Sequence, residues 1–444
     1  MKRFKFLGAW RAHGWTEPAF VEVDDRGIIA AIADRNDKKD FETVAGWAVP
    51  GVLNAHSHAF QYAMAGLAEH LPTGKADDDF WSWRETMYSQ ALSVTPDSLR
   101  AIATLAYAEM VRRGFTSVVE FHYLHHQEDG GVYTPITKLA ETLAEAASQT
   151  GIRLTLVPVH YRTGDFGTPA SRRQRRFLFE SADAYLKFAD QCAAIAKTGG
   201  HEIGGGVHSL RASPAEDTIR IFRDLPKHWP RHLHIAEQLK EVESCQKHLR
   251  QRPIEWLLKN VDLDPRFYLV HCTHANPEEV TGLAKSKAHV VLCPTTEGNL
   301  GDGVFPLVEF WEAGGRFLIG TDSHVGLDPW EELRWADYQQ RLRLHKRNPL
   351  CKSGEESGDL LLRSVVNSHS LSVGASLDAL VLDGAHPLWE RLKPAHRISN
   401  LIYAPAARPP LGTLIAGKWI ARDGRHLKED AFTNEFRKLF GARA

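Results

Sequence analysis

The distribution of hydrophobic and polar residues changes twice along the chain. Residues 1–48 contain short apolar runs separated by polar turns, such as FVEVD at 20–24 and GIIAAIA at 27–33, which is typical of β-hairpins. From 49 to 372, short apolar runs alternate with segments of helical periodicity, and this alternation indicates βα units around a parallel sheet. Beyond 373 the chain returns to short predicted strands, in LDALVLDG, ISNLIYA and GKWIARDGRHL.

These patterns predict an α/β protein built on a (β/α)₈ TIM-like barrel. We expect the barrel to occupy residues 49–372, with a small β-sandwich domain formed by both ends of the chain, 1–48 and 373–444. One helix stands out in TPDSLRAIATLAYAEMVRRG, where Thr95 or Asp97 can cap the start and Gly114 ends the helical pattern. Functional side chains of such barrels lie at the carboxyl ends of the strands, so those ends are the places to search.

Two histidines, His56 and His58, follow the apolar run VPGVLNA. Residues i and i+2 of an extended chain point to the same side, so both imidazoles can reach one metal ion, although an HxH pair also occurs among surface and core histidines. His234 in HLHIAEQ and Asp322 in LIGTDSH also end predicted strands. Taken singly, these two suit a core histidine and a helix cap. Together, the four residues predict one zinc site (Zn²⁺), and Fe²⁺ or Mn²⁺ would also suit these ligands.

Composition excludes several classes of partner. The chain has 54 Lys and Arg against 55 Asp and Glu, a net charge of -1, so nothing attracts nucleic acid or an anionic membrane. Its five cysteines form no CxxC pair, which favours reduced thiols. The start of the chain lacks the apolar region of a signal peptide, and no later run is long enough to cross a bilayer. We therefore expect a cytoplasmic protein.

The segments PGVLNAHSH, HLHIAEQ, LVHCTH, CPTTEGNLGDG and IGTDSH resemble the amidohydrolase superfamily, and the resemblance covers nearly the whole chain. Binuclear members of that superfamily carry a bridging lysine at the end of the fourth barrel strand. The corresponding segment here, GGGVHSLRA, has His208 instead. The resemblance therefore implies a mononuclear, deaminase-like metal hydrolase.

The same resemblance implies three catalytic residues, His271, Glu237 and Asp322. His271 suits the activation and steering of a water molecule, and Glu237 suits a hydrogen bond to the substrate nitrogen and transfer of a proton to it. The division of the proton transfers among the three residues stays open. Glu237 could also be a solvated carboxylate in the first turn of a helix.

The segments DDDFWSWRETMY, VVEFHYLHH and VHSLRASP are similar to one branch of the superfamily. That branch hydrolyses the formimino C–N bond of N-formimino-L-glutamate, giving N-formyl-L-glutamate and ammonia in histidine degradation. Two arginines would suit a small-molecule substrate with two carboxylates. Arg84 could instead be a surface cation packed on Trp81 or Trp83. The substrate-binding residues implied by the resemblance are Gln61, Arg84, Tyr123, His208 and Arg211.

Two other functions remain open at this point. Another deaminase of the superfamily would act on a purine, an adenosine derivative or a triazine, none of which needs two arginines. A non-catalytic binding protein would have lost a metal ligand or an acid–base group, whereas this chain has a candidate at each position. The resemblance also implies a homodimer.

Overall fold

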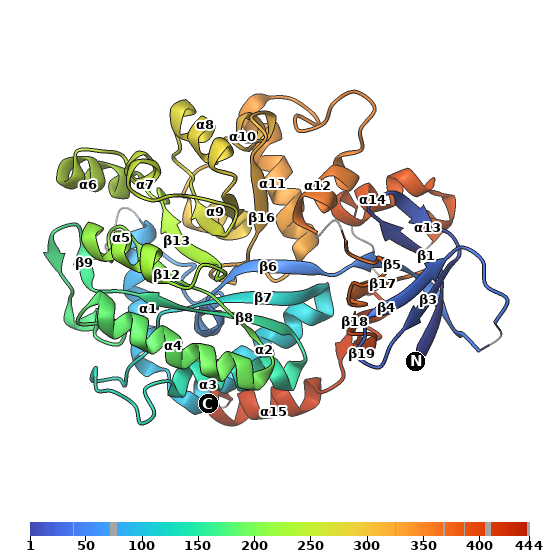
Figure 1. The fold of residues 1–444 in the computed structure, drawn as a ribbon, viewed down its shortest axis with the longest axis horizontal. Coiled ribbons are helices and arrows are strands. Elements are labelled where there is room, and N and C mark those ends of the chain that lie inside the picture. The colour runs from blue at the N-terminus through green and yellow to red at the C-terminus, as the bar shows by residue number, and fades with distance from the viewer. Residues whose placement is uncertain are drawn as a thin grey trace.

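The computed structural model describes residues 1–38, 40–71, 78–324, 326–366, 369–385, 387–404 and 410–441. Its centre is a parallel sheet whose main strands neighbour one another in chain order. The first and last of these strands approach each other, because Ser57 bridges Asp322 and the Asp322 amide donates to the His56 carbonyl at 3.0 Å. The result is a nearly closed eight-stranded barrel (Figure 1). Its strands are β6 (Val52–Ser57), β7 (Phe115–His122), β8 (Arg153–His160), β12 (Gly205–Ser209), β13 (Arg231–Ile235), β14 (Phe267–His271), β15 (His289–Leu292) and β16 (Arg316–Ile319), with β11 (Glu202–Ile203) added beside β8.

Helices cover the outside of the barrel (Figure 1). The helix predicted from its caps is present: the Thr95 side chain accepts from the Ser98 amide, and Gly114, at φ 109°, ends the helix. The helices that accompany the barrel strands are α1 (Phe80–Ser93), α2 (Pro96–Arg113), α3 (Lys138–Thr150), α4 (Ala182–Gly199), α5 (Ala215–Asp224), α6 (Leu239–Leu249), α7 (Pro253–Asn260), α8 (Pro277–Ser286), α9 (Pro294–Leu300), α10 (Leu307–Glu312), α11 (Pro329–Leu344) and α12 (Ser357–Val365). No helix in the described ranges is long and apolar enough to cross a membrane.

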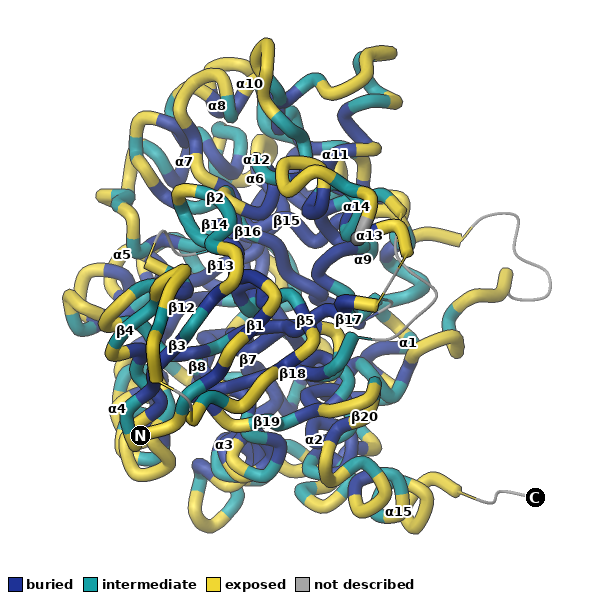
Figure 2. The backbone as a smooth tube through the Cα atoms, turned by 90° about the vertical axis from the view of Figure 1, so that its right-hand side faces the viewer, coloured by how far each residue is buried: buried dark blue, intermediate teal, exposed yellow. Residues whose placement is uncertain are grey.

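Strands from both ends of the chain join one further sheet, with the order β20-β19-β18-β17-β5-β1-β3-β4 and β2 beside β1. The two ends meet where β5 and β17 pair antiparallel, with Val49 opposite Leu380. This sheet faces the viewer in Figure 2 and buries its own apolar cluster, which includes Phe4 and Phe6. Its sandwich form and the predicted domain boundaries stay predictions. The strands are β1 (Lys2–Arg11), β2 (Gly14–Thr16), β3 (Ala19–Val23), β4 (Ile29–Ala33), β5 (Glu42–Pro50), β17 (Ala379–Asp383), β18 (Gly412–Ile415), β19 (Lys418–Arg422) and β20 (Arg425–His426).

The sequence pattern predicted strands for the end of the chain, but this region also contains helices. The run ISNLIYA, predicted to be a strand, forms helix α14 (Arg397–Tyr403), which buries Ile398 and Ile402 on one face. A short apolar run does not distinguish a strand from a buried helix, and here packing against α11 and α12 decides. Two more helices occur, α13 (Pro387–Arg391) and α15 (Glu429–Phe440), and α15 lies against α2 through an Arg100–Glu435 ion pair at 3.0 Å.

The close approach of β12 and β13 gives a test of the barrel. A Cβ on Gly206 would lie 2.0 Å from the His232 carbonyl oxygen, a backbone atom that cannot rotate away. We expect Gly206→Ala to lower the free energy of unfolding by about 1–3 kcal/mol or more, measured by urea or thermal unfolding. Gly298→Ala in α9 is the matched control, because its Cβ would find no atom nearer than 4.0 Å. Unchanged stability of the Gly206 variant would contradict this account of the strand contact.

Candidate active site

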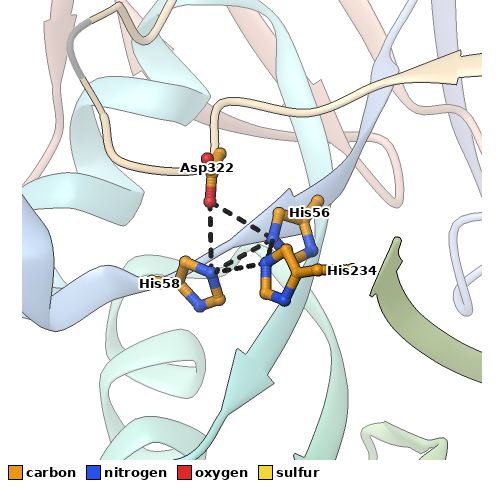
Figure 3. A group of neighbouring side chains, drawn as sticks. All are labelled: His56, His58, His234 and Asp322. Carbon is orange, nitrogen blue, oxygen red and sulfur yellow. Dashed lines mark hydrogen bonds and ion pairs between the residues drawn. The ribbon is translucent and has the colours of Figure 1, made fainter. Parts of the chain in front are cut away.

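Four side chains converge at the carboxyl end of the barrel (Figure 3). His56 lies near the end of β6, His58 directly follows that strand, and His234 lies near the end of β13. Asp322 lies shortly after the end of β16. The Nε2 atom of His56 lies 3.1 Å from that of His58 and 3.0 Å from that of His234. Asp322 Oδ1 lies 3.3 Å from His56 Nε2 and 3.1 Å from His58 Nε2. All four residues are buried, so the predicted cluster forms.

The hydrogen bonds of the Nδ1 atoms, on the far side of each ring from the converging Nε2 atoms, show that this cluster fits a cation. His58 Nδ1 lies 2.9 Å from the Phe121 carbonyl, and His234 Nδ1 lies 2.9 Å from the His208 carbonyl. Carbonyl oxygens only accept, so each Nδ1 carries the proton and each Nε2 keeps its lone pair. Lone pairs at this spacing repel one another unless a positive charge lies between them. Three imidazoles and one carboxylate, with Nδ1 partners that orient the rings, are therefore suited to a divalent metal.

The electrostatic state of His56 agrees with a role as ligand. Burial, followed by the nearby His58, lowers the pKa of His56 to about 3. The ring is consequently neutral at physiological pH and free to coordinate.

A buried carboxylate supports the metal-binding strand from behind. Glu120 on β7 accepts from Ser57 Oγ at 2.9 Å, from Tyr107 OH at 3.0 Å and from the Ala59 amide at 2.8 Å. Ser57 stands between the two histidines and points to the opposite side of the strand. This network holds the end of β6 in place. Glu120 belongs to the segment VVEFHYLHH, but the sequence assigned it no role.

His271 lies beside the metal cluster with carboxylates around its ring. Its Nδ1 is 3.3 Å from Glu297 Oε1, and its Nε2 is 3.7 Å from Glu237 Oε1 and 3.9 Å from Asp322 Oδ2. Burial disfavours the charged ring, but Glu237, Glu297 and Asp322 together raise the pKa of His271 to about 10. Glu297 thus orients His271, and its Nε2 is placed to hold a proton next to Glu237.

Glu237 is not the solvated helix carboxylate that the sequence left open, because it is buried. Burial raises its pKa to about 6, and Arg211 Nη2 lies 3.5 Å from its Oε2. Its backbone amide donates to Glu241 at 3.1 Å, and Glu241 also faces Arg211. Glu237 therefore connects the His271 side of the site with an arginine.

A small cavity of about 40 Å³ opens beside the metal cluster. All five residues that the sequence assigned to substrate binding line it, although their roles in binding stay predictions. Gln61 donates from Nε2 to Tyr123 OH at 2.8 Å, so two of the five are coupled directly. The five are Gln61, Arg84, Tyr123, His208 and Arg211.

Sequence analysis left open that Arg84 is a surface cation packed on a tryptophan. Arg84 does pack on a tryptophan, Trp81, but it lines the cavity. Its guanidinium carbon lies 4.3 Å from the centre of the Trp81 ring, and that of Arg211 lies 5.8 Å from the same ring. The Nε and Nη1 atoms of Arg84 are buried and have no hydrogen-bond partner among the described residues. Buried donors of this kind are costly unless an acceptor completes them, which indicates an anionic ligand in the cavity.

Sequence reasoning missed several residues of the site. Tyr88 and Tyr161 line the cavity, and Glu297 and Glu241 contact its charged groups. Two of them had a signal, because Glu297 belongs to the segment CPTTEGNLGDG and Tyr88 to DDDFWSWRETMY. Glu241 lies in α6 and Tyr161 follows β8, and no segment that carries the resemblance contains them.

Comparisons with known proteins agree with this geometry. The model of the amidohydrolase family matches residues 47–357. The chain is 41% identical over 439 residues to the formimidoylglutamate deiminase of Pseudomonas aeruginosa, covering 96% of each chain. It is 25% identical over 440 residues to the 5'-deoxyadenosine deaminase of Methanopyrus kandleri, covering 93% of this chain and 92% of the relative.

Solved structures give the same answer for the fold. A crystal structure of an amidohydrolase from Brucella melitensis matches with a TM-score of 0.91 and 36% identity, covering 99% of both chains. An adenosine deaminase from Xanthomonas campestris with bound zinc matches with a TM-score of 0.79 and 22% identity, covering 98% of this chain and 97% of that one. The chain belongs to the amidohydrolase family. Within that family it is a deiminase-type hydrolase that acts on C–N bonds.

The converging ligands predict the effect of removing one of them. We expect His234→Ala to weaken metal binding by more than the roughly 10–100-fold that loss of an outer-shell partner costs. Metal content after dialysis against a metal buffer, read by elemental analysis, measures this. His228→Ala changes an exposed histidine that precedes β13, whereas His234 lies near the other end of that strand, and this control should leave the content unchanged. Full metal content in the His234 variant would remove this residue from the ligand set.

Proposed function

We propose that this protein hydrolyses N-formimino-L-glutamate to N-formyl-L-glutamate and ammonia, with one zinc ion held by His56, His58, His234 and Asp322. The observation that carries the proposal is the pair of guanidiniums in the cavity beside the metal cluster, those of half-buried Arg84 and buried Arg211. A glutamate skeleton has two carboxylates, and each guanidinium suits one of them. The 41% identity to the Pseudomonas aeruginosa deiminase supports the same substrate.

The reaction adds one water across the formimino C–N bond. The oxygen of the water ends on the carbon, and both of its hydrogens leave with the nitrogen as ammonia. When bound, zinc lowers the pKa of a coordinated water toward neutrality and so supplies the nucleophile.

The residues of the chain then handle protons and orientation. His271 Nε2 and Glu237 Oε1 are 3.7 Å apart, a spacing that one water or a small side-chain movement bridges, so a proton can pass between them. Glu237 also lies near Arg211, on the cavity side, where it would meet the substrate nitrogen. We assign the activation and steering of the water to His271, and delivery of protons to the departing nitrogen to Glu237. Asp322 Oδ2, 3.9 Å from His271 Nε2, is placed to share the first step.

A purine or triazine deaminase is the second candidate, and relatives with such activities exist. An 8-oxoguanine deaminase of Pseudomonas aeruginosa is 27% identical to this chain over 442 residues. Its substrate has no carboxylate, which would leave the buried donors of Arg84 without an acceptor. A non-catalytic binding protein is less consistent still, since every metal ligand and acid–base group is present.

We also propose a place in histidine degradation, in the cytoplasm, for a homodimeric enzyme that binds no nucleic acid or membrane. These proposals rest on the similarity to the deiminase and on the composition of the chain.

The substrate panel tests the proposed function. Ammonia release by the zinc-loaded protein should be rapid with N-formimino-L-glutamate, slow but measurable with N-formimino-glycine, and absent with guanine and adenosine. The reason is that only the first offers two carboxylates to the two arginines. Turnover of a purine in place of the diacid would reject the proposed substrate and keep the metal chemistry.

The assignment of His271 is tested by His271→Asn. We expect the variant to keep its metal, because His271 is not among the four converging ligands. Its kcat should fall by about 10²–10⁴-fold, the usual contribution of acid–base catalysis. Metal content and steady-state kinetics measure the two effects. Loss of metal from this variant would make His271 a ligand, and near-normal turnover would remove it from catalysis.

A further inference from the structure

The segment between β8 and α4 carries the sequence ASRRQRRF, whose charge suggests a solvated loop. It contains β9 (Thr163–Asp165), β10 (Thr168–Pro169) and the short helix η2 (Arg172–Gln174). Arg176 is in fact fully buried and donates to the carbonyls of His126 and Val94, both at 2.7 Å. Arg173 donates to Ser89 Oγ at 2.8 Å and pairs with Glu85.

Ser89, Glu85 and Val94 belong to α1 or directly follow it. The arginine-rich segment 170–177 therefore holds α1 in place through hydrogen bonds and an ion pair. This matters for the site because α1 carries Arg84 and Tyr88, both of which line the cavity.

Gln174 lies at the centre of this contact and is buried. Its Oε1 accepts from the Ser171 backbone amide at 2.8 Å. Its Nε2 lies 3.1 Å from Tyr88 OH and 2.6 Å from Tyr161 OH. A backbone N–H can only donate, so the atom next to it must be the amide oxygen, and the orientation of the Gln174 side chain follows. Its two N–H groups are thus directed at the two phenol oxygens.

The direction of these hydrogen bonds decides what the two tyrosines offer to a ligand. Each phenol oxygen accepts from Gln174, so neither hydroxyl hydrogen can point toward the amide. Burial, followed by the neighbouring Tyr161, raises the pKa of Tyr88, which therefore stays protonated. Tyr88 and Tyr161 line the cavity together with Arg84, whose guanidinium carbon is 5.5 Å from the centre of the Tyr88 ring. Tyr88 and Tyr161 also hydrogen-bond each other, so one hydroxyl donates to the other phenol and the second hydroxyl hydrogen is left for a ligand.

We propose that Gln174 is a positioning residue that sets substrate specificity: it orients the Tyr88–Tyr161 pair so that one hydroxyl donates to the second, side-chain carboxylate of the substrate, which Arg84 binds. This inference rests on the proposed function and deepens it. On this side of the cavity an anion meets the Arg84 guanidinium and that hydroxyl as donors, whereas a neutral or donor-bearing group would leave them unsatisfied.

Gln174→Glu is the sharpest test, because it keeps the size of the side chain and turns its donors into acceptors. The phenol hydrogens would then turn toward Glu, and this side of the cavity would gain a negative charge. We expect kcat/KM for N-formimino-L-glutamate to fall by at least about tenfold, mostly through KM, since about 1.4 kcal/mol corresponds to tenfold and bonds to charged groups are worth more. For N-formimino-glycine, which lacks the second carboxylate, the fall should be less than about threefold.

Two further variants keep the inference testable if Gln174→Glu folds poorly. Gln174→Met removes the donors without adding charge, and Tyr161→Phe removes one hydroxyl while keeping the ring. Each should raise KM for the diacid, and the double variant should be less impaired than the sum of the two, because both act on one interaction. Metal content and thermal unfolding of each variant show whether the fold and the ligand cluster persist.

Equal losses for the diacid and for N-formimino-glycine would overturn the inference and make Gln174 a purely structural residue. Strictly additive effects of the two substitutions would also overturn it. A wild-type protein that is inactive on N-formimino-L-glutamate would instead reject the proposed function, and the inference with it.

Discussion

The convergence of three imidazole Nε2 atoms and one carboxylate oxygen is the constraint on which the rest of the structure depends. Lone pairs about 3 Å apart are unfavourable without a cation, so the barrel must hold each ligand rigidly to keep them together. It does so with carbonyl partners for two rings and with the Glu120 network behind β6. Closure of the barrel between Ser57 and Asp322 brings residues of the first and last strands into the same ligand cluster.

The charged side chains around this centre contact one another in succession and do not form separate pairs. Glu297 orients His271, His271 faces Glu237, and Glu237 faces an arginine of the cavity. Burial strengthens each of these interactions because water does not screen them. These contacts connect the metal cluster to the cavity through titratable side chains, the arrangement that the proposed proton transfers need.

The cavity itself is made by elements outside the barrel sheet. Helix α1 supplies an arginine and a tyrosine, and the arginine-rich segment before α4 holds that helix in place. Among the described residues, the buried Nε and Nη1 of Arg84 have no hydrogen-bond partner, an arrangement that suits an anionic ligand. The barrel strands thus hold the metal cluster, and the connecting segments shape the cavity beside it.

The alternation of apolar runs and helical segments in the amino-acid sequence predicted the barrel, and polar residues at the strand ends predicted the metal cluster. The five predicted residues that line the cavity came from the resemblance to the amidohydrolases, not from periodicity. The sequence did not determine that ISNLIYA is a helix, since a short apolar run suits either conformation until its packing partners are known. Nor did it reveal the contacts of Glu120, Glu297 and Gln174, whose partners are distant in the chain. A charge run such as RRQRR looks solvated in sequence, and only tertiary structure supplies the buried carbonyls that satisfy Arg176.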